Sequence, residues 1–145
     1  MNEPSLIKGG YAQDTRGKVI YVNDFDMKDV RRFYQISNSE INYERGWQGH
    51  KIEQRWFHAI KGIFKIKLIA FEEHKRSDYI DCKVFILSEK EPAILHIPPG
   101  YVSNIKAETE ENLLGVYSDF TLGSIDDEIR YDLGYFNKTI EINND

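Results

Sequence analysis

IEQRWFHAIKGIFKIKLIAF, residues 52–71, contains the pattern that decides the fold class. In residues 63–71, apolar side chains alternate with two lysines, and this period of two is typical of a strand with one buried face. Lys61-Gly62 separates that strand from the apolar stretch at residues 52–60 and has the composition of a tight hairpin connection. We therefore predict two consecutive strands here.

Short apolar stretches of the same kind recur on both sides, separated by turn residues. Pro98-Pro99-Gly100 ends one of them sharply, because proline cannot donate to a β ladder. Residues 124–134 have helical potential, and the charged residues 72–76 and 108–111 are typical of solvated turns. The expected strands are residues 18–22, 30–36, 52–60, 63–71, 80–87, 93–97 and 112–120. Many short strands with little helix predict an all-β sandwich or closed barrel.

Length and composition are those of one ordinary domain. The chain has 145 residues without an internal repeat or a Gly/Ser linker, so we expect a single domain over residues 1–145. Aromatic residues make up 13% of the chain, and their rings favour strands. The single cysteine, Cys82, excludes an internal disulfide and is expected to be a small buried hydrophobe.

Charge and hydropathy exclude several classes of partner. The net charge of −5 argues against a nucleic-acid surface, which needs a basic face. No apolar run approaches the roughly 18 residues of a membrane span. The N-terminus has no charged-then-apolar signal pattern, so we expect a cytoplasmic protein without membrane or nucleic-acid partners.

Residues 45–51, RGWQGHK, form the most unusual stretch, with two cations, an amide and an imidazole beside an indole. On an extended chain, Gln48 and His50 point to the same face. If that face is the interior of a barrel, both side chains enter the mouth of a cavity, where barrels hold small ligands. The alternative is a polar loop in which His50 makes one surface hydrogen bond.

Six segments in order resemble the WxcM-like 3,4-ketoisomerases acting on dTDP-4-keto-6-deoxyglucose and, more distantly, the dTDP-4-keto-sugar 3,5-epimerases. The resemblance extends from about residue 8 to about residue 132. Its segments are DTRGKV (14–19), VRRFY (30–34), RGWQGHK (45–51), KG (61–62), LHIPPG (95–100), and LGVYSDF (114–120) followed by IRYD (129–132). The resemblance implies a cupin-type double-stranded β-helix, or jelly-roll barrel, that forms a homodimer, in some relatives by exchanging N-terminal strands.

The activity implied by the resemblance is metal-independent proton transfer next to the ketone of a nucleotide-linked 4-keto-deoxysugar. Such isomerases and epimerases serve cell-surface polysaccharide or deoxysugar biosynthesis and need no cofactor, because the ketone itself acidifies the neighbouring carbon. Histidine suits the base, and cations or amides suit the stabilisation of a developing oxyanion.

One departure from the family pattern concerns the base. Gln48 stands where the family has its first histidine, and an amide cannot remove a carbon-bound proton. His50 occupies the position of the family's second histidine, while Phe120 and Thr121 stand where the family has its paired tyrosines. Three readings stay open: His50 is the base, the protein binds a nucleotide sugar without turning it over, or a different histidine, His96 or His58, serves.

The candidate catalytic residues are therefore His50 as acid or base, Gln48 to orient the sugar, and Arg55 to hold an enolate oxygen. Arg55 falls where the resemblance places a pocket lysine of the epimerases; its alternative is an exposed position on the outer strand face. The candidate substrate-binding residues are Arg16, Arg45 and His96.

A metal-dependent oxygenase is the remaining hypothesis for a cupin. Metal cupins use His-x-His, a following Glu and a later His, and these positions are occupied here by Gln48, His50, Glu53 and Ser103. One imidazole and one carboxylate are too few ligands, so we expect no metal.

Overall fold

The computed structural model describes residues 2–72, 79–136 and 139–144, and within these ranges it contains strands and no helix. The strands are β1 (Ser5–Lys8), β2 (Gly10–Asp14), β3 (Gly17–Tyr21), β4 (Arg32–Ile36), β5 (Glu44–His50), β6 (Arg55–Lys61), β7 (Ile63–Ala70), β8 (Tyr79–Ser88), β9 (Ala93–Ile97), β10 (Tyr101–Ala107), β11 (Leu113–Ser118), β12 (Glu128–Arg130) and β13 (Thr139–Asn144). The all-β prediction is confirmed. No helix long and apolar enough to cross a membrane occurs in the described ranges.

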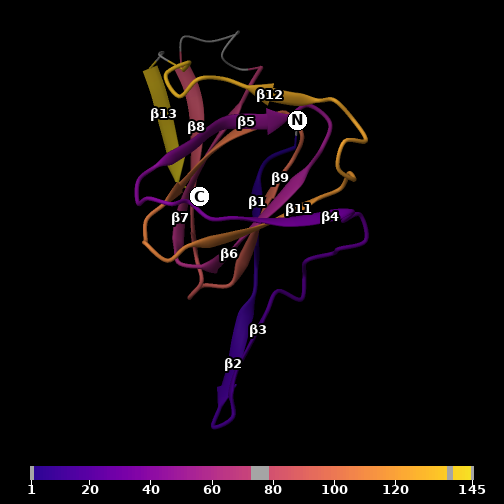
Figure 1. Cartoon of the computed structure of the whole chain (residues 1–145), viewed down its shortest axis with the longest axis vertical. Coiled ribbons are helices and arrows are strands. Elements are labelled where there is room, and N and C mark those ends of the chain that lie inside the picture. Colours follow the sequence, from indigo (N-terminus) through magenta and orange to yellow (C-terminus); the bar gives the residue numbers. More distant parts are fainter. Residues whose placement is uncertain (1, 73–78, 137–138, 145) are drawn as a thin grey trace.

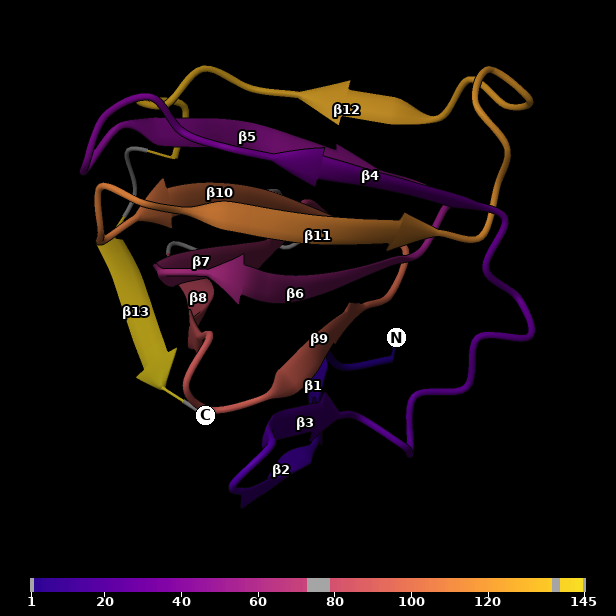
Figure 2. The same ribbon diagram turned by 60° about the horizontal axis from the view of Figure 1, so that its bottom comes forward.

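Two sheets face each other and form the jelly roll (Figures 1 and 2). The first has the order β1-β9-β6-β11-β4 and the second the order β12-β5-β10-β7-β8-β13. Neighbouring strands are antiparallel, except that β13 runs parallel to β8. Strands β2 and β3 form a separate hairpin that projects from the barrel at the bottom of Figure 1.

The core between the sheets follows the period-two pattern of β7. Phe64, Ile66 and Leu68 are fully buried, while Lys65 and Lys67 on the other face are only half-buried. Burial of each such apolar side chain contributes roughly 1.5–3 kcal/mol to folding. The core is completed by residues of both sheets, including Phe57, Leu95, Leu114, Val116 and Phe85.

Lys61-Gly62 is a tight turn, but its prediction as a hairpin is wrong. Strand β6 pairs with β9 and β11, whereas β7 pairs with β10 and β8, so the turn joins the two sheets at a corner. Gly62 has a φ of 77°, and a Cβ there would lie 2.2 Å from Oγ1 of Thr109 and 2.3 Å from the carbonyl oxygen of Glu111. Only glycine fits, because the conformation is left-handed and the corner is closely packed.

A second apolar cluster covers the outer face of the six-stranded sheet, where Trp47, Ile69 and Val102 pack beneath Ile129 and Phe136. The helical potential predicted for residues 124–134 is not realised. This segment contains β12, which pairs with β5, and Asp127 and Ile129 are buried on it. Tertiary pairing with β5 overrides a weak local helix preference.

Most of the other sequence-based expectations are confirmed. Strand β9 ends at Ile97, directly before the two prolines, and Cys82 is buried. Residues 108–111 form an exposed turn between β10 and β11. Of the turn predicted at residues 72–76, all but residue 72 lies outside the described residues.

Candidate functional site

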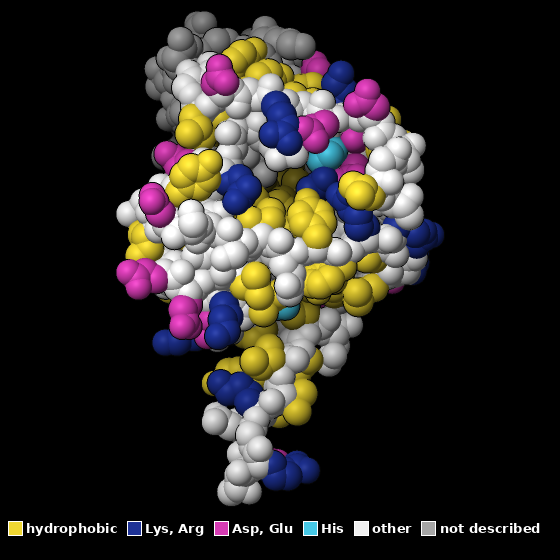
Figure 3. Space-filling model, viewed as in Figure 1, with side chains coloured by type: hydrophobic (Ala, Val, Ile, Leu, Met, Phe, Trp, Pro, Cys, Tyr) yellow, Lys and Arg dark blue, Asp and Glu magenta, His cyan; other side chains and the backbone are white. Residues whose placement is uncertain are grey.

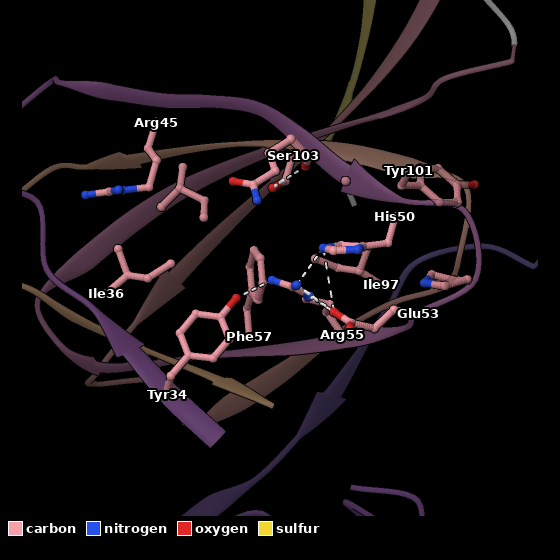
Figure 4. Close-up of a pocket in the computed structure, with 14 residues that line it drawn as sticks. Tyr34, Ile36, Arg45, His50, Glu53, Arg55, Phe57, Ile97, Tyr101 and Ser103 are labelled. Atoms are coloured by element: carbon pink, nitrogen blue, oxygen red, sulfur yellow. Dashed lines mark hydrogen bonds and ion pairs between the residues drawn. The ribbon is translucent and has the colours of Figure 1, made fainter. Parts of the chain in front are cut away.

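A pocket opens between the sheets inside the barrel, and the space-filling view shows a histidine and several cations around a hollow (Figures 3 and 4). The empty space of the pocket, counted together with the open solvent at its mouth, is about 530 Å³. The lining residues are Tyr34, Ile36, Arg45, Gln48, Gly49, His50, Glu53, Arg55, Phe57, Ile97, Pro98, Tyr101, Ser103 and Ile105.

An irregularity in β5 brings Arg45 to the same pocket as Gln48. Gln48 pairs with Ser103 and Arg45 pairs with Ile105, so β5 has one more residue than β10 between these pairs. Such a β-bulge shifts the alternation of faces by one residue. Arg45 and Gln48 therefore both line the pocket although they are three residues apart, while Trp47 between them is buried in the outer cluster.

His50 is oriented by a buried carboxylate. Its Nδ1 lies 2.9 Å from Oδ1 of Asp127, whose Oδ2 accepts hydrogen bonds from the backbone N–H groups of Ile52 at 2.9 Å and Glu53 at 2.8 Å. An ionised carboxylate only accepts, so we assign the proton of the neutral imidazole to Nδ1 and the lone pair to Nε2. Nε2 is the nitrogen directed toward Arg55 in the pocket (Figure 4).

The pKa of Asp127 is held below its ordinary value. Burial acts to raise this pKa, but the backbone N–H of Glu53, the imidazole of His50 and the backbone N–H of Ile52 together lower it. Asp127 is therefore ionised at neutral pH, which favours the Nδ1–H tautomer of His50.

Arg55 lies at the centre of the charged network. Its Nε donates to Oε2 of Glu53 at 2.6 Å, its Nη2 lies 2.5 Å from both that oxygen and His50 Nε2, and its Nη1 donates to the Tyr34 hydroxyl. A second cation, Arg32, lies 3.9 Å from Glu53. The Glu53 side chain is only 6% exposed, so these two guanidinium groups neutralise a carboxylate that water hardly reaches.

The structure brings together Gln48, His50, Arg55 and Arg45 among the predicted site residues. Arg55 shares the inner face of β6 with Phe57 and Ala59, as the alternation along the strand predicts. Arg45 is at the rim, where its Nε donates to Oδ1 of Asn38 at 3.2 Å.

Arg16 and His96 lie away from the pocket, and their proposed roles stay predictions. Arg16 is at the tip of the β2–β3 hairpin, where it pairs with Asp14 and its side chain is 88% exposed. His96 lies on the outer face of the five-stranded sheet, stacked on Trp56 with its Nε2 2.6 Å from Oε1 of Gln54. Burial lowers the pKa of this imidazole, partly offset by Asp119. His58 lies on the same outer face and lines a different groove.

Sequence reasoning did not identify the roles of Asp127 and Tyr34. Asp127 is 77 residues from His50 and adjoins β12, and no local pattern connects the two. One feature of the sequence could have placed Tyr34 near the pocket. The period of two puts Tyr34 on the same face of β4 as Ile36, and Ile36 packs against the core.

The four positions compared with metal cupins, Gln48, His50, Glu53 and Ser103, all line the pocket. Of these four residues, His50 and Glu53 have the imidazole and carboxylate groups that commonly bind metals, and the Arg55 guanidinium lies between them. In the described part of the chain, no group of three His, Cys, Asp or Glu side chains converges as metal ligands. Absence of a metal stays a prediction.

Asp127→Asn is expected to lower any activity that depends on His50 by at least about tenfold, because the amide no longer fixes the imidazole tautomer.

The same variant tests how much the Asp127 carboxylate contributes to the stability of the fold. Folding lowers the pKa of Asp127. The ionised carboxylate therefore contributes its full stabilisation at any pH above the ordinary aspartate pKa of about 3.9. This stabilisation is lost as the pH falls through the lower pKa that Asp127 has in the folded protein. Thermal melts should show a constant difference in Tm between the two proteins from about pH 5 to 8 that shrinks below about pH 4. A difference independent of pH down to strong acid would contradict the role assigned to this carboxylate.

Known proteins resemble this chain in fold far more than in sequence. No protein-family model and no curated protein matches the chain. A variant of the 3,4-ketoisomerase QdtA from Thermoanaerobacterium thermosaccharolyticum, solved in complex with TDP-4-keto-6-deoxyglucose, is 22% identical with a TM-score of 0.70 and covers 90% of this chain and 89% of its own. A 3,4-ketoisomerase from Helicobacter canadensis is 19% identical, with a TM-score of 0.69 and coverage of 89% and 91%.

The epimerases are similar in the same way. The dTDP-4-dehydrorhamnose 3,5-epimerase from Elizabethkingia anophelis is 12% identical with a TM-score of 0.75, covering 96% of this chain and 80% of its own. These similarities extend over nearly the whole chain and confirm the cupin-type jelly roll. The chain therefore has the fold shared by the sugar-nucleotide 3,4-ketoisomerases and 3,5-epimerases.

Proposed function

We propose that this protein is a metal-independent isomerase or epimerase that moves a proton next to the ketone of a nucleotide-linked 4-keto-deoxysugar. The observation that carries the proposal is the His50–Asp127 pair, which directs the Nε2 lone pair into a pocket beside a guanidinium group. A base beside a fixed cation is the arrangement needed to form and hold an enolate. A structural neighbour solved with TDP-4-keto-6-deoxyglucose and another that is a dTDP-4-dehydrorhamnose 3,5-epimerase support this choice of substrate.

The proposed reaction begins when the ketone oxygen accepts an N–H of Arg55. This oxygen takes the place of His50 Nε2 as acceptor, so the lone pair of the imidazole becomes free. Nε2 then removes the proton from the neighbouring carbon, and Arg55 stabilises the negative oxygen of the enolate. The pocket excludes most water, because the side chains of His50 and Arg55 are only 10% and 14% exposed, and this strengthens both interactions.

The remaining polar groups of the pocket have binding roles in the proposal. The Gln48 side chain can donate to and accept from sugar hydroxyls, but it cannot act as a base. Arg45, which is exposed at the rim, suits the diphosphate of the nucleotide.

Exchange of the carbon-bound proton in heavy water tests the proposal directly. The wild-type protein would be incubated with dTDP-4-keto-6-deoxyglucose and related keto-sugars, and deuterium incorporation followed by NMR and mass spectrometry. We expect incorporation at a carbon next to the ketone. If none of these sugars exchanges a proton, the enzymatic proposal fails.

A non-catalytic nucleotide-sugar-binding protein is the second candidate, favoured by one observation: Gln48 lines the pocket at the position of the family base. Calorimetry with the same sugars distinguishes the two. Binding without exchange would support the second candidate and overturn the first.

We also propose that the protein is a homodimer. The projecting β2–β3 hairpin exposes Tyr11, Val19 and Ile20, each more than half accessible, and apolar surface of this kind is commonly covered by a partner. A partner's hairpin would also offer a route by which Arg16 reaches a pocket. Light scattering is expected to give twice the mass of the 17.0 kDa chain, and a monomer would contradict this.

A further inference from the structure

We infer that Glu53 determines which sugars this pocket accepts by their charge. Its carboxylate cancels the excess positive charge of two arginines, so that an uncharged sugar binds and a sugar acid is rejected. The inference rests on the proposed function and assigns the residue that sets the charge of its substrate. It is carried by the contacts of the Glu53 side chain, which lines the pocket beside Arg55 and is 6% exposed (Figure 4).

Among the described residues, the charges around the proposed base cancel. The cations are Arg55 and Arg32. The anions are Glu53 and Asp127, and all four side chains are between 3% and 20% exposed. His50 adds no charge, because a guanidinium group only donates and the Nε2 atom that lies 2.5 Å from Nη2 of Arg55 must therefore have a lone pair. The interior of the pocket is electrically neutral before a ligand enters.

Glu53 occupies the edge of Arg55 to which an anion would bind. Guanidinium groups hold carboxylates through neighbouring N–H groups. Here Nε donates to Oε2 of Glu53 at 2.6 Å, and Nη2 lies 2.5 Å from the same oxygen, while Nη1 donates to the Tyr34 hydroxyl. A ketone oxygen can replace His50 as the acceptor at Nη2 without adding charge. A carboxylate at that place would meet the like charge of Glu53.

The other interior cation contacts no ligand directly. Arg32 is not among the residues that line the pocket, and its Nη2 lies 3.9 Å from Oε2 of Glu53. It acts on a ligand only through its charge, which Glu53 offsets. Arg45 is different, because it lies at the rim, donates to the uncharged Asn38 and has no ion-pair partner among the described residues. Recognition of anions therefore belongs to the mouth of the pocket, where Arg45 suits the diphosphate.

This balance of charge also suits the proposed proton transfer. The C–H bond of the sugar breaks as an N–H bond forms at Nε2 of His50, and the electron pair of the C–H bond passes to the enolate. One imidazolium and one enolate arise together, so the total charge of the interior does not change. The imidazolium forms 3.6 Å from Oε2 of Glu53, which offsets its repulsion by Arg55.

The affinities for dTDP-glucose and dTDP-glucuronate, measured by calorimetry at neutral pH, test the inference. The two ligands share the nucleotide and the diphosphate and differ by one carboxylate, so their ratio reports the charge of the interior rather than contacts at the rim. We expect the wild-type protein to bind dTDP-glucose at least about tenfold more tightly, which is a modest effect for a like charge a few ångströms away in a partly buried site.

Two single variants should move this ratio in opposite directions. Glu53→Gln leaves one excess cation and should shift the ratio toward the sugar acid by at least about tenfold. Arg32→Gln leaves one excess anion, keeps the pair of Glu53 with Arg55, and should shift the ratio further toward dTDP-glucose. Thermal melts establish which variants are folded, and if Glu53→Gln does not fold, Arg32→Gln decides.

The double variant Glu53→Gln/Arg32→Gln restores the neutral interior and should return the ratio to its wild-type value. A merely structural role of Glu53 predicts no such return. Glu111→Gln is the matched control, because it removes the same charge from a side chain that is 87% exposed, and its ratio should equal that of the wild type.

Two results would overturn the inference and leave the proposed function intact. One is equal affinity of the wild-type protein for the two ligands, and the other is a ratio that the folded variants leave unchanged. A wild-type protein that binds neither ligand would overturn the inference together with the proposed function, which requires a site for nucleotide sugars. Loss of proton exchange alone would contradict only the proposed reaction, because the ratio of affinities is measured without turnover.

Discussion

Replacing His50 with asparagine is expected to lower proton exchange by about 10²–10⁴-fold. Asparagine retains a side-chain N–H that can donate to Asp127, so the buried carboxylate keeps a partner, but the variant has no titratable nitrogen directed at Arg55. The loss should therefore be one of chemistry rather than folding. Deuterium incorporation measures the rate, while calorimetry with the same nucleotide sugar should show affinity within about tenfold of wild type.

His58→Asn is the matched control for this experiment. His58 also carries an imidazole on β6, but it lies on the outer face of the five-stranded sheet, and burial lowers its pKa. The control variant should exchange protons at the wild-type rate. If His58→Asn loses exchange and His50→Asn retains it, the base has been assigned to the wrong histidine.

Arg55→Gln is expected to reduce turnover by about 10²–10³-fold, because it removes the cation that holds the enolate oxygen. The same change leaves the Glu53 carboxylate, which is 6% exposed, with Arg32 at 3.9 Å as its remaining cation among the described side chains. Removing one partner of a buried ion pair typically costs about 3–5 kcal/mol of unfolding free energy. Steady-state kinetics and chemical denaturation measure the two effects separately.

The double variant Arg55→Gln/Glu53→Gln separates catalysis from folding. Without the Glu53 charge, no buried carboxylate is left poorly paired, so much of the lost stability should return. Turnover should stay low, since the cation is still missing. If turnover returns together with stability, the guanidinium of Arg55 serves only the fold.

Much of the fold is predictable because a strand with one buried face has apolar residues at every second position of its local sequence. The alternation in β7 and the inner face shared by Arg55, Phe57 and Ala59 follow from the period of two, and the end of β9 follows from proline chemistry. Which strands pair with which is not local. The Lys61-Gly62 turn has the composition of a hairpin, yet it joins two sheets, because β6 pairs with β9 and β11 whereas β7 pairs with β8 and β10.

The helix expected at residues 124–134 fails for a related reason. A short segment with weak helical preference gains more by hydrogen bonding to the edge of β5 and burying Ile129 over the second cluster. Backbone pairing of this kind depends on a partner strand about 80 residues earlier in the chain, so no window of local sequence contains it.

The sequence by itself determined strands such as β6, β7 and β9, which side chains of β6 and β7 share a face, and the placement of Gln48 and His50 on one face, because each depends on residues close together in the chain. Only the tertiary structure decided that Arg45 joins them, since the bulge in β5 appears only when β10 is paired with it. It also decided that His96 lies on the outer face, that Asp127 orients His50, and that Tyr34 meets Arg55. These contacts join residues from separate strands, and their geometry comes from the packing of two sheets rather than from any period in the sequence.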